Sequence, residues 1–190
     1  MNIEYHAIAD PNCSSCRKLQ AKIQILQERL ADLERQAWDD TLTGLANRRH
    51  FIEMLEQRIA RCKRYGDSSA LLFLDVNELK LVNDSLGHAA GDVVLRALAK
   101  LIADNIRRSD FAARIGGDEF AIILDNLDAD QVEAKIGELM TLMARSELNF
   151  EGQPITLRAA IGYCFVGPTD NVEGLMSRAD AAMYEVKRAR

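Results

Sequence analysis

At the centre of this chain lies the stretch Ala113-Arg114-Ile115-Gly116-Gly117-Asp118-Glu119-Phe120, between two short apolar runs at residues 111–115 and 120–124. Apolar runs that a glycine-containing turn separates predict a β-hairpin. The two glycines carry no Cβ, so a bulky ligand can approach the backbone of the turn closely. The carboxylates of Asp118 and Glu119 then lie at the tip, within reach of solvent and metal ions. Taken alone, the stretch favours a solvated, acidic hairpin turn.

The composition is that of a globular domain with a short appendage. The chain has 190 residues, of which 48% are hydrophobic, enough to bury a core. A net charge of −5 argues against a general binder of nucleic acids or membrane surfaces, since either partner favours a basic face. No apolar run has the length of a transmembrane helix and no signal-peptide pattern opens the chain, so we expect a cytoplasmic protein. Its four cysteines are too few and too scattered for a disulfide scaffold.

The N-terminal segment, residues 1–38, combines an irregular tail with a narrow apolar stripe. Steps of four and three residues separate the members of this stripe, which are Leu19, Ile23, Leu26, Leu30, Leu33 and Ala37. Such spacing is the a/d seam of a coiled coil, and it predicts self-association of two chains. The alternative is an amphipathic helix that packs on its own domain, but that arrangement normally uses a broader apolar face.

The remaining residues, 39–190, alternate helical and strand patterns. Apolar residues at helical spacing predict helices within residues 51–65, 94–102, 132–143 and 172–186. Continuous apolar runs predict a buried strand at residues 70–74 and one long strand at residues 155–166, in addition to the hairpin. Helices interleaved with strands, two of them in a hairpin, predict an α+β sandwich with helices packed on a sheet that contains antiparallel pairs.

Two carboxylates are the first candidates for chemistry. Asp75 ends the predicted strand at residues 70–74, and Asp118 lies at the tip of the hairpin. If these strands are neighbours, both carboxylates meet at one edge of the sheet, where they offer the hard oxygen ligands that Mg²⁺ prefers. A metal pair about 3.5–4 Å apart can activate an attacking hydroxyl and stabilise a leaving oxygen. The alternative for Asp75 is a helix N-cap.

Several separated motifs resemble those of the GGDEF family of diguanylate cyclases. They are the central stretch 113–120, the segment 40–49 (DTLTGLANRR), the segment 73–92 (FLDVNELKLVNDSLGHAAGD) and the segment 179–187 (ADAAMYEVK). The resemblance covers residues 40–187 and keeps the order and spacing of the motifs. It implies the ferredoxin-like palm that is also found in nucleotide cyclases and polymerases.

The resemblance also implies roles for single residues. Each active site would hold two Mg²⁺ or Mn²⁺ ions. Their ligands would be the side chains of Asp75 and Asp118 and the backbone carbonyl of Val76. The base would be Glu119 or a metal-bound hydroxide. The residues that would hold GTP are Leu79, Lys80, Asn83, His88, Asp92, Gly116, Gly117 and Lys187. Asp92 would accept paired hydrogen bonds from guanine N1 and N2, which adenine cannot supply. For His88 and Lys187, ordinary positions at helix ends are the alternatives.

A second site is implied nine residues before Gly116. Arg107 and Asp110 match the Arg-x-x-Asp site through which the family's product, cyclic di-GMP, inhibits the enzyme. In a charged chain this short motif also arises by chance, so its offset from the hairpin carries the inference.

The resemblance implies an enzyme that condenses two GTP into cyclic di-GMP and two pyrophosphates. Each domain would hold one GTP, so a homodimer must bring two half-sites together. A second interpretation is a GGDEF domain that only senses GTP or cyclic di-GMP, and a third is a polymerase-like or mononucleotide cyclase palm. A domain that only senses nucleotides is expected to have lost Asp75, Lys80, Asp118 or Glu119, and this chain retains all four, which favours the cyclase interpretation. Asn83 and Asp92, as guanine readers, argue against the third.

The chain departs from the family pattern in a few places. Asn77 stands where many members carry a second Asp, Leu79 where Phe is common, and Met183 where Leu is common. The sequence stops at Arg190, before the usual Gly-Arg pair, so one phosphate-binding Arg is either missing or replaced by Arg188 or Arg190.

The cysteines before the predicted coiled coil carry a further hypothesis. In a parallel dimer, Cys13 and Cys16 of both chains would meet, and four thiolates suit tetrahedral Zn²⁺, with His6 as a spare ligand. Interchain disulfides and ordinary free thiols are the alternatives.

Overall fold

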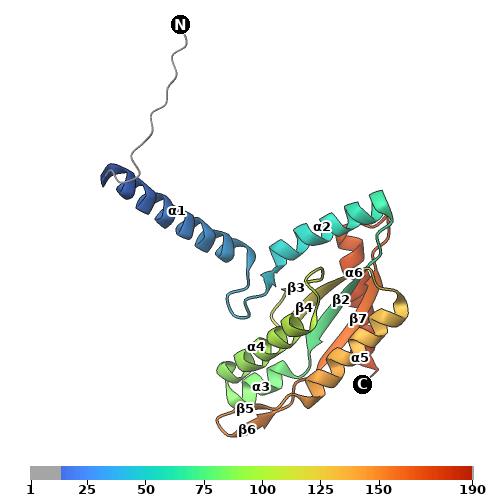
Figure 1. The fold of residues 1–190 in the computed structure, drawn as a ribbon. Coiled ribbons are helices and arrows are strands. Elements are labelled where there is room, and N and C mark those ends of the chain that lie inside the picture. The colour runs from blue at the N-terminus through green and yellow to red at the C-terminus, as the bar shows by residue number, and fades with distance from the viewer. Residues whose placement is uncertain (1–13, 190) are drawn as a thin grey trace. The chain divides into compact units, whose positions relative to one another are not determined.

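The computed structural model describes the backbone of residues 14–189 and the side chains of residues 18–29 and 37–189 (Figure 1). The chain divides into two compact units, one that ends at Ala37 and one that begins at Trp38. No helix within the described residues is long and apolar enough to cross a membrane.

Helix α1 (Ser14–Trp38) makes up the described part of the first unit. Three members of its apolar stripe are described, and all are exposed, with relative accessibilities of 62% for Leu19, 48% for Ile23 and 64% for Leu26. An isolated helix that leaves large aliphatic side chains in water gains little stability of its own. These side chains are therefore available to a partner.

A five-stranded sheet forms the centre of the second unit, in the order β1-β3-β4-β2-β7. Its strands are β1 (Ala46–Asn47), β2 (Ser69–Val76), β3 (Phe111–Arg114), β4 (Glu119–Asp125) and β7 (Ala159–Phe165). Strand β2 is antiparallel to both β4 and β7, whereas β1 and β3 are parallel. A separate hairpin joins β5 (Leu148–Phe150) to β6 (Gln153–Ile155).

Five helices cover the two faces of this sheet (Figure 1). On one face lie α3 (Leu79–Leu86), α4 (His88–Asn105) and α5 (Ala129–Arg145), and on the other α2 (Arg48–Tyr65) and α6 (Val172–Arg188). Alternate residues of β2 enter the two cores: Leu72 and Leu74 pack with α4, and Leu71 and Phe73 pack with α2 and α6. Every residue of β2 is buried, because the strand is covered on both faces and paired on both edges.

The predicted α+β sandwich with a ferredoxin-like palm is confirmed, and two local predictions change. The long strand expected at residues 155–166 is interrupted at 156–158, because Ile155 pairs with Leu148 in the outer hairpin and only β7 joins the central sheet. Helix α3 was not anticipated, since its eight residues are too few for a clear helical period.

Candidate active site

The register of β2 and β4 brings the acidic residues to one edge of the sheet. Asp75 pairs with Glu119 across the two strands, and the Val76 amide donates to the Asp118 carbonyl at 3.0 Å. The hairpin turn closes on itself, because the Ile115 amide donates to the Glu119 carbonyl at 2.9 Å. The two strands thus place Asp75, Asp118 and Glu119 side by side, as their positions at strand ends predicted.

Glu119 is the acidic residue of this edge whose proton affinity its surroundings raise. Burial raises the pKa of Glu119, and the charges of Asp118, Asp75 and Asp180 raise it further. Asp180 comes from α6, and sequence reasoning did not identify it as part of this cluster. A carboxyl with a raised pKa lies closer to neutral pH, where it serves better as a general base.

Helix α6 supplies a cation to the same place. Lys187 Nζ lies 2.7 Å from Asp75 Oδ1, and this hydrogen bond raises the pKa of Lys187. The helix approaches β7 closely, since a Cβ at Gly162 would overlap the backbone of Met183, one turn before Lys187. Asp75 is 7% exposed. It caps no helix, because Glu78 is the N-cap residue of α3, the helix that follows. The N-cap alternative for Asp75 is therefore wrong.

The donor set fits a hard divalent cation. Among the side chains that the structure describes, residues 18–29 and 37–189, no three His, Cys, Asp or Glu form a preassembled metal cage. Mg²⁺ does not need one, because it is usually held by one or two carboxylates together with waters and substrate phosphates. The mutual repulsion that raises the pKa of Glu119 is the kind of strain that a bound cation relieves. Asp75, Asp118 and the Val76 carbonyl thus fit Mg²⁺ or Mn²⁺ without a closed cage.

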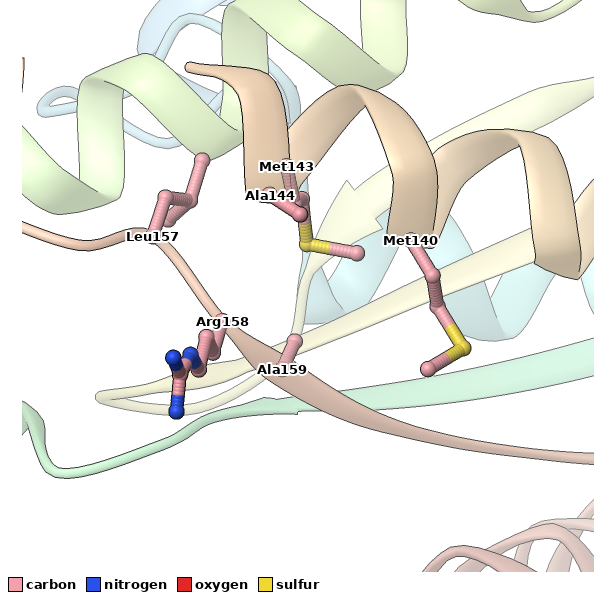
Figure 2. Close-up of a pocket in the computed structure, with 6 residues that line it drawn as sticks. All are labelled: Met140, Met143, Ala144, Leu157, Arg158 and Ala159. Carbon is pink, nitrogen blue, oxygen red and sulfur yellow. The ribbon is translucent and has the colours of Figure 1, made fainter. Parts of the chain in front are cut away.

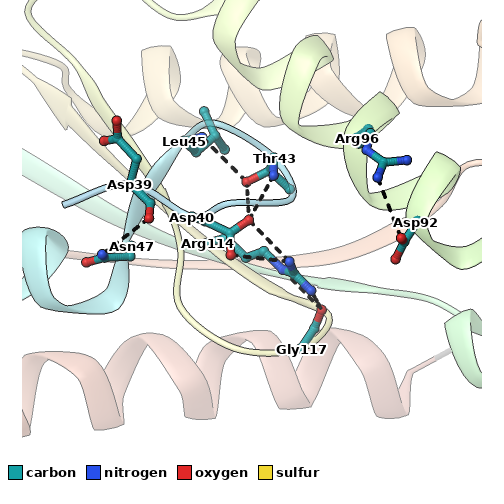
Figure 3. Close-up of polar contacts among 9 residues, drawn as sticks. All are labelled: Asp39, Asp40, Thr43, Leu45, Asn47, Asp92, Arg96, Arg114 and Gly117. Atoms are coloured by element: carbon teal, nitrogen blue, oxygen red, sulfur yellow. Dashed lines mark hydrogen bonds and ion pairs between the residues drawn. The ribbon is translucent and has the colours of Figure 1, made fainter. Parts of the chain in front are cut away.

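Helices α3 and α4 bring together the two proposed guanine readers. The side chain of Asn83 lies against Gly91, where any Cβ would overlap Asn83 Oδ1, and Asp92 is the next residue. Asp92 is half-exposed and lies 3.6 Å from Arg96 one turn later (Figure 3). The sequence alone did not predict that position 91 must be glycine to make room for the side-chain amide of Asn83.

The remaining predicted nucleotide contacts lie at the starts of α3 and α4 and in the hairpin turn. Leu79 is buried, whereas Lys80 and His88 are exposed in the first turns of α3 and α4. Glu78 does not cap α3 with its side chain, so the first amides of this helix lack a side-chain partner at its N-cap. In the hairpin turn, the Glu119 carboxylate lies over Gly116, and the space beside the Cα of Gly117 is open.

The loop before α2 is tied to the hairpin turn (Figure 3). Arg114 Nη1 lies 3.2 Å from Asp40 Oδ1, and Arg114 Nη2 donates to the Gly117 carbonyl at 2.7 Å. Asp40 Oδ1 also accepts hydrogen bonds from the amide and the hydroxyl of Thr43. Burial raises the pKa of Asp40, but the hydrogen bonds from Thr43 and Arg114 outweigh it and hold the pKa below its usual value. Asp40 therefore fixes the shape of the turn that carries Asp118, a role that the sequence did not reveal.

The Arg-x-x-Asp pair lies at the opposite end of β3 from the acidic turn. Asp110 Oδ2 accepts from the Arg107 amide at 2.9 Å, and Asp110 Oδ1 accepts from the Asp125 amide at 3.2 Å. Arg58 supports the same loop by donating to the Ser109 carbonyl at 3.1 Å. Asp110 thus shapes the loop, while Arg107 stays exposed and available to a ligand.

Two other predictions find no support in the described residues. Arg188 lies over the Tyr184 ring and 3.8 Å from Glu185, and Arg190 lies outside the described residues. His6 and Cys13 lie outside them as well, as does the side chain of Cys16. The zinc site therefore stays a prediction.

Comparison with known proteins identifies the domain. The family described as diguanylate cyclase, GGDEF domain, matches residues 37–190. The diguanylate cyclase DgcP of Pseudomonas aeruginosa is 36% identical over 160 residues, which cover 84% of this chain and 24% of DgcP. The diguanylate cyclase TpbB of the same species is 37% identical over 166 residues, 86% of this chain and 38% of TpbB. The chain thus spans well under half the length of both relatives.

A solved structure shows the same fold. The coiled coil and GGDEF domain of DgcB from Caulobacter crescentus, in complex with c-di-GMP, matches with a TM-score of 0.86 and 31% identity. The match covers 93% of this chain and 94% of that chain. Because the family match takes in the whole sheet, the helices around it and the acidic hairpin, this chain belongs to the diguanylate cyclase GGDEF-domain family.

Proposed function

We propose that this chain is a diguanylate cyclase that condenses two GTP into cyclic di-GMP and two pyrophosphates. The observation that carries the proposal is the meeting of Asp75, Asp118 and Glu119 at one sheet edge, with Lys187 bonded to Asp75. A domain that only senses nucleotides has no need to retain this acidic cluster. The three named relatives, which are cyclases or contain the GGDEF domain bound to c-di-GMP, support the same assignment.

Each residue of the site has a part in this chemistry. Asp92 and Asn83 orient guanine, and the start of α3 receives the phosphates. Asp75, the carbonyl of Val76 and Asp118 would hold a divalent metal ion, which would supply Lewis-acid activation of the phosphate and of the attacking 3′-hydroxyl. Glu119, whose pKa is raised, accepts the hydroxyl proton. Lys187 places its ammonium beside Asp75, where negative charge accumulates as pyrophosphate leaves.

A single domain binds one GTP and forms half of the active site. Two domains must face each other so that each 3′-hydroxyl attacks the α-phosphate of the other nucleotide. Holding two reactants in this way can remove roughly 7–11 kcal/mol of the barrier. The exposed stripe of α1 is the element through which we expect two chains to associate.

The decisive experiment is incubation of the protein with GTP and Mg²⁺, followed by identification of the product by mass spectrometry. Cyclic di-GMP and pyrophosphate in a ratio of one to two are the expected products. Binding of GTP without any product would favour the sensor interpretation, and a linear or mononucleotide cyclic product would favour the polymerase-like one.

Asp92 should set the preference for guanine. Asp92→Ser removes the acceptor for guanine N1 and N2, so we expect GTP to bind roughly tenfold to a hundredfold more weakly and the preference over ATP to shrink. The measurement is competition between GTP and ATP. Arg96→Ala is the matched control, because it breaks the same ion pair but leaves the carboxylate in place. An unchanged GTP/ATP ratio in Asp92→Ser contradicts the assignment.

Arg107 should carry product inhibition. Arg107→Ala removes an exposed guanidinium but leaves the loop intact, since Arg107 bonds to Asp110 only through its backbone amide and carbonyl. We expect an unchanged initial rate and a progress curve that no longer slows as cyclic di-GMP accumulates. The neighbouring substitution Arg108→Ala is the control, and its progress curve should slow as that of the wild type does. If the progress curves of both variants slow alike, Arg107 is an ordinary surface residue.

A further inference from the structure

A cavity of about 380 Å³ lies beside the acidic cluster, at the ends of three segments that are far apart in the sequence. Its lining residues are Asn77, Glu78, Arg158 and Lys187. Lys187 is the residue that bonds to Asp75, so the cavity adjoins the acidic edge of the sheet. Sequence reasoning assigned no role to Arg158.

The backbone fixes Arg158 at this cavity. The Asn77 amide donates to the Arg158 carbonyl at 2.9 Å, which ties the residue before β7 to the residue after β2. Leu157 and Ala159 enter the core beneath α5, whereas Ala160 enters the core beneath α6. Since side chains alternate along an extended chain, Arg158 lies on the α6 side.

Figure 2 shows α5 on one side of the segment that carries Arg158. The guanidinium of Arg158 points away from Met140 and Met143 of that helix. These methionines line an apolar pocket on the α5 side, to which Arg158 contributes along with Leu157 and Ala159. Arg158 also lines the cavity to which Lys187 belongs, and Met140 and Met143 do not line that cavity.

The guanidinium is also free to take a ligand. Arg158 is exposed, and among the described residues no carboxylate lies within ion-pair distance of it. Glu78 lines the same cavity, yet the two side chains form no ion pair there. Arg and Lys that project from different elements into one recess are an arrangement suited to a polyphosphate, because Arg binds phosphate oxygens through paired hydrogen bonds.

We propose that Arg158 binds the terminal phosphates of GTP, opposite Lys187, and so holds the pyrophosphate leaving group. This inference rests on the proposed use of GTP. It assigns the two cations different tasks: Lys187 bonds to Asp75 at the edge of the cavity, whereas Arg158 has only the nucleotide to bind. A group that contacts the β- and γ-phosphates adds affinity for GTP and none for GMP.

The test compares GTP with GMP in the full chain. Binding of the non-hydrolysable analogue guanosine 5′-(α,β-methylene)triphosphate and of GMP is measured by calorimetry with Mg²⁺ present. Arg158→Ala should weaken binding of the analogue roughly tenfold to a hundredfold and leave that of GMP within about twofold. Arg158→Lys retains the charge and should recover part of the loss. Arg145→Ala, an exposed arginine in the last turn of α5, removes the same charge elsewhere and should change neither affinity.

The outcomes separate this inference from the proposed activity. Unchanged affinity of Arg158→Ala for the analogue, or an equal loss for the analogue and GMP, overturns the role of Arg158 even if the wild type makes cyclic di-GMP. A selective loss for the analogue supports the role of Arg158 even if no cyclic product forms, in which case the cyclase proposal alone fails. Thermal unfolding of each variant establishes that the fold is retained.

Discussion

Asp118→Asn should lower the turnover of GTP more than about a hundredfold while the domain stays folded. Asparagine keeps the shape of the side chain but loses the charge that attracts a divalent cation. Loss of residues that merely orient metal ligands typically costs 10–100-fold, so loss of a ligand should cost more. The backbone contact from the Val76 amide to the Asp118 carbonyl does not depend on the side chain, and it should persist.

A stability measurement separates this effect from damage to the fold. The charge of Asp118 raises the pKa of Glu119, which means that the ionised cluster opposes folding at neutral pH. Removing that charge should therefore leave the free energy of unfolding at pH 7 equal or higher. Below the pKa of Glu119, where this carboxyl is protonated, the difference from the wild type should fade.

A matched control is available on the far side of the domain. Asp130→Asn removes one carboxylate from the first turn of α5 and should leave turnover unchanged. If Asp118→Asn retains a tenth or more of wild-type activity, Asp118 does not hold the metal.

Disrupting the α1 stripe should convert cyclic di-GMP synthesis into a reaction limited by protein association. Leu19→Lys combined with Leu26→Lys places charges on a seam that is exposed in the single chain, so the fold of the domain should not suffer. Linked binding modules raise the effective concentration of one partner by orders of magnitude. We therefore expect a monomer in sedimentation, and at nanomolar protein a rate per molecule at least about tenfold below that of the wild type.

The dependence on protein concentration identifies the cause. In the seam variant the rate per molecule should rise with concentration, while GTP binding by each domain stays intact. Ala21→Lys combined with Gln24→Lys adds the same charges at outer positions of the heptad, away from the seam, and should leave the dimer and the rate unchanged. A deletion that ends at Ala37, and so preserves the contact of Trp38 with His50 at 5.1 Å between ring centroids, should behave like the seam variant. A stable dimer with full activity after either change would refute the role of α1.

Local patterns in the sequence were sufficient for the fold class and the family. The Gly-Gly turn between two apolar runs predicted the β3–β4 hairpin, because turn residues and strand residues are chosen by backbone sterics within a few positions. The fully apolar run at residues 70–74 predicted a buried strand, and β2 extends it by a residue or two at each end. The GGDEF-type motifs then sufficed for the family, which the comparison confirmed.

Patterns that depend on a distant partner were misread. Apolar residues continue through 155–166, yet Ile155 and Ala159 belong to different sheets, because pairing with β5 or with β2 is decided by neighbours elsewhere in the chain. Helix α3 follows directly after β2 and is held partly by its packing on α4, which no window of eight residues reveals.

The meeting of charges at the site is a property of the tertiary structure alone. On α6, Lys187 reaches Asp75 and Asp180 acts on Glu119, because Gly162 lets that helix lie close to β7. Arg158 reaches the same neighbourhood because its carbonyl is bonded to Asn77. Coulombic interactions depend on distances in space, to which separations in the sequence are no guide. The sequence was enough to name the chemical groups and the hairpin that carries two of them, while packing decided which charges face one another and which cation stays free for a ligand.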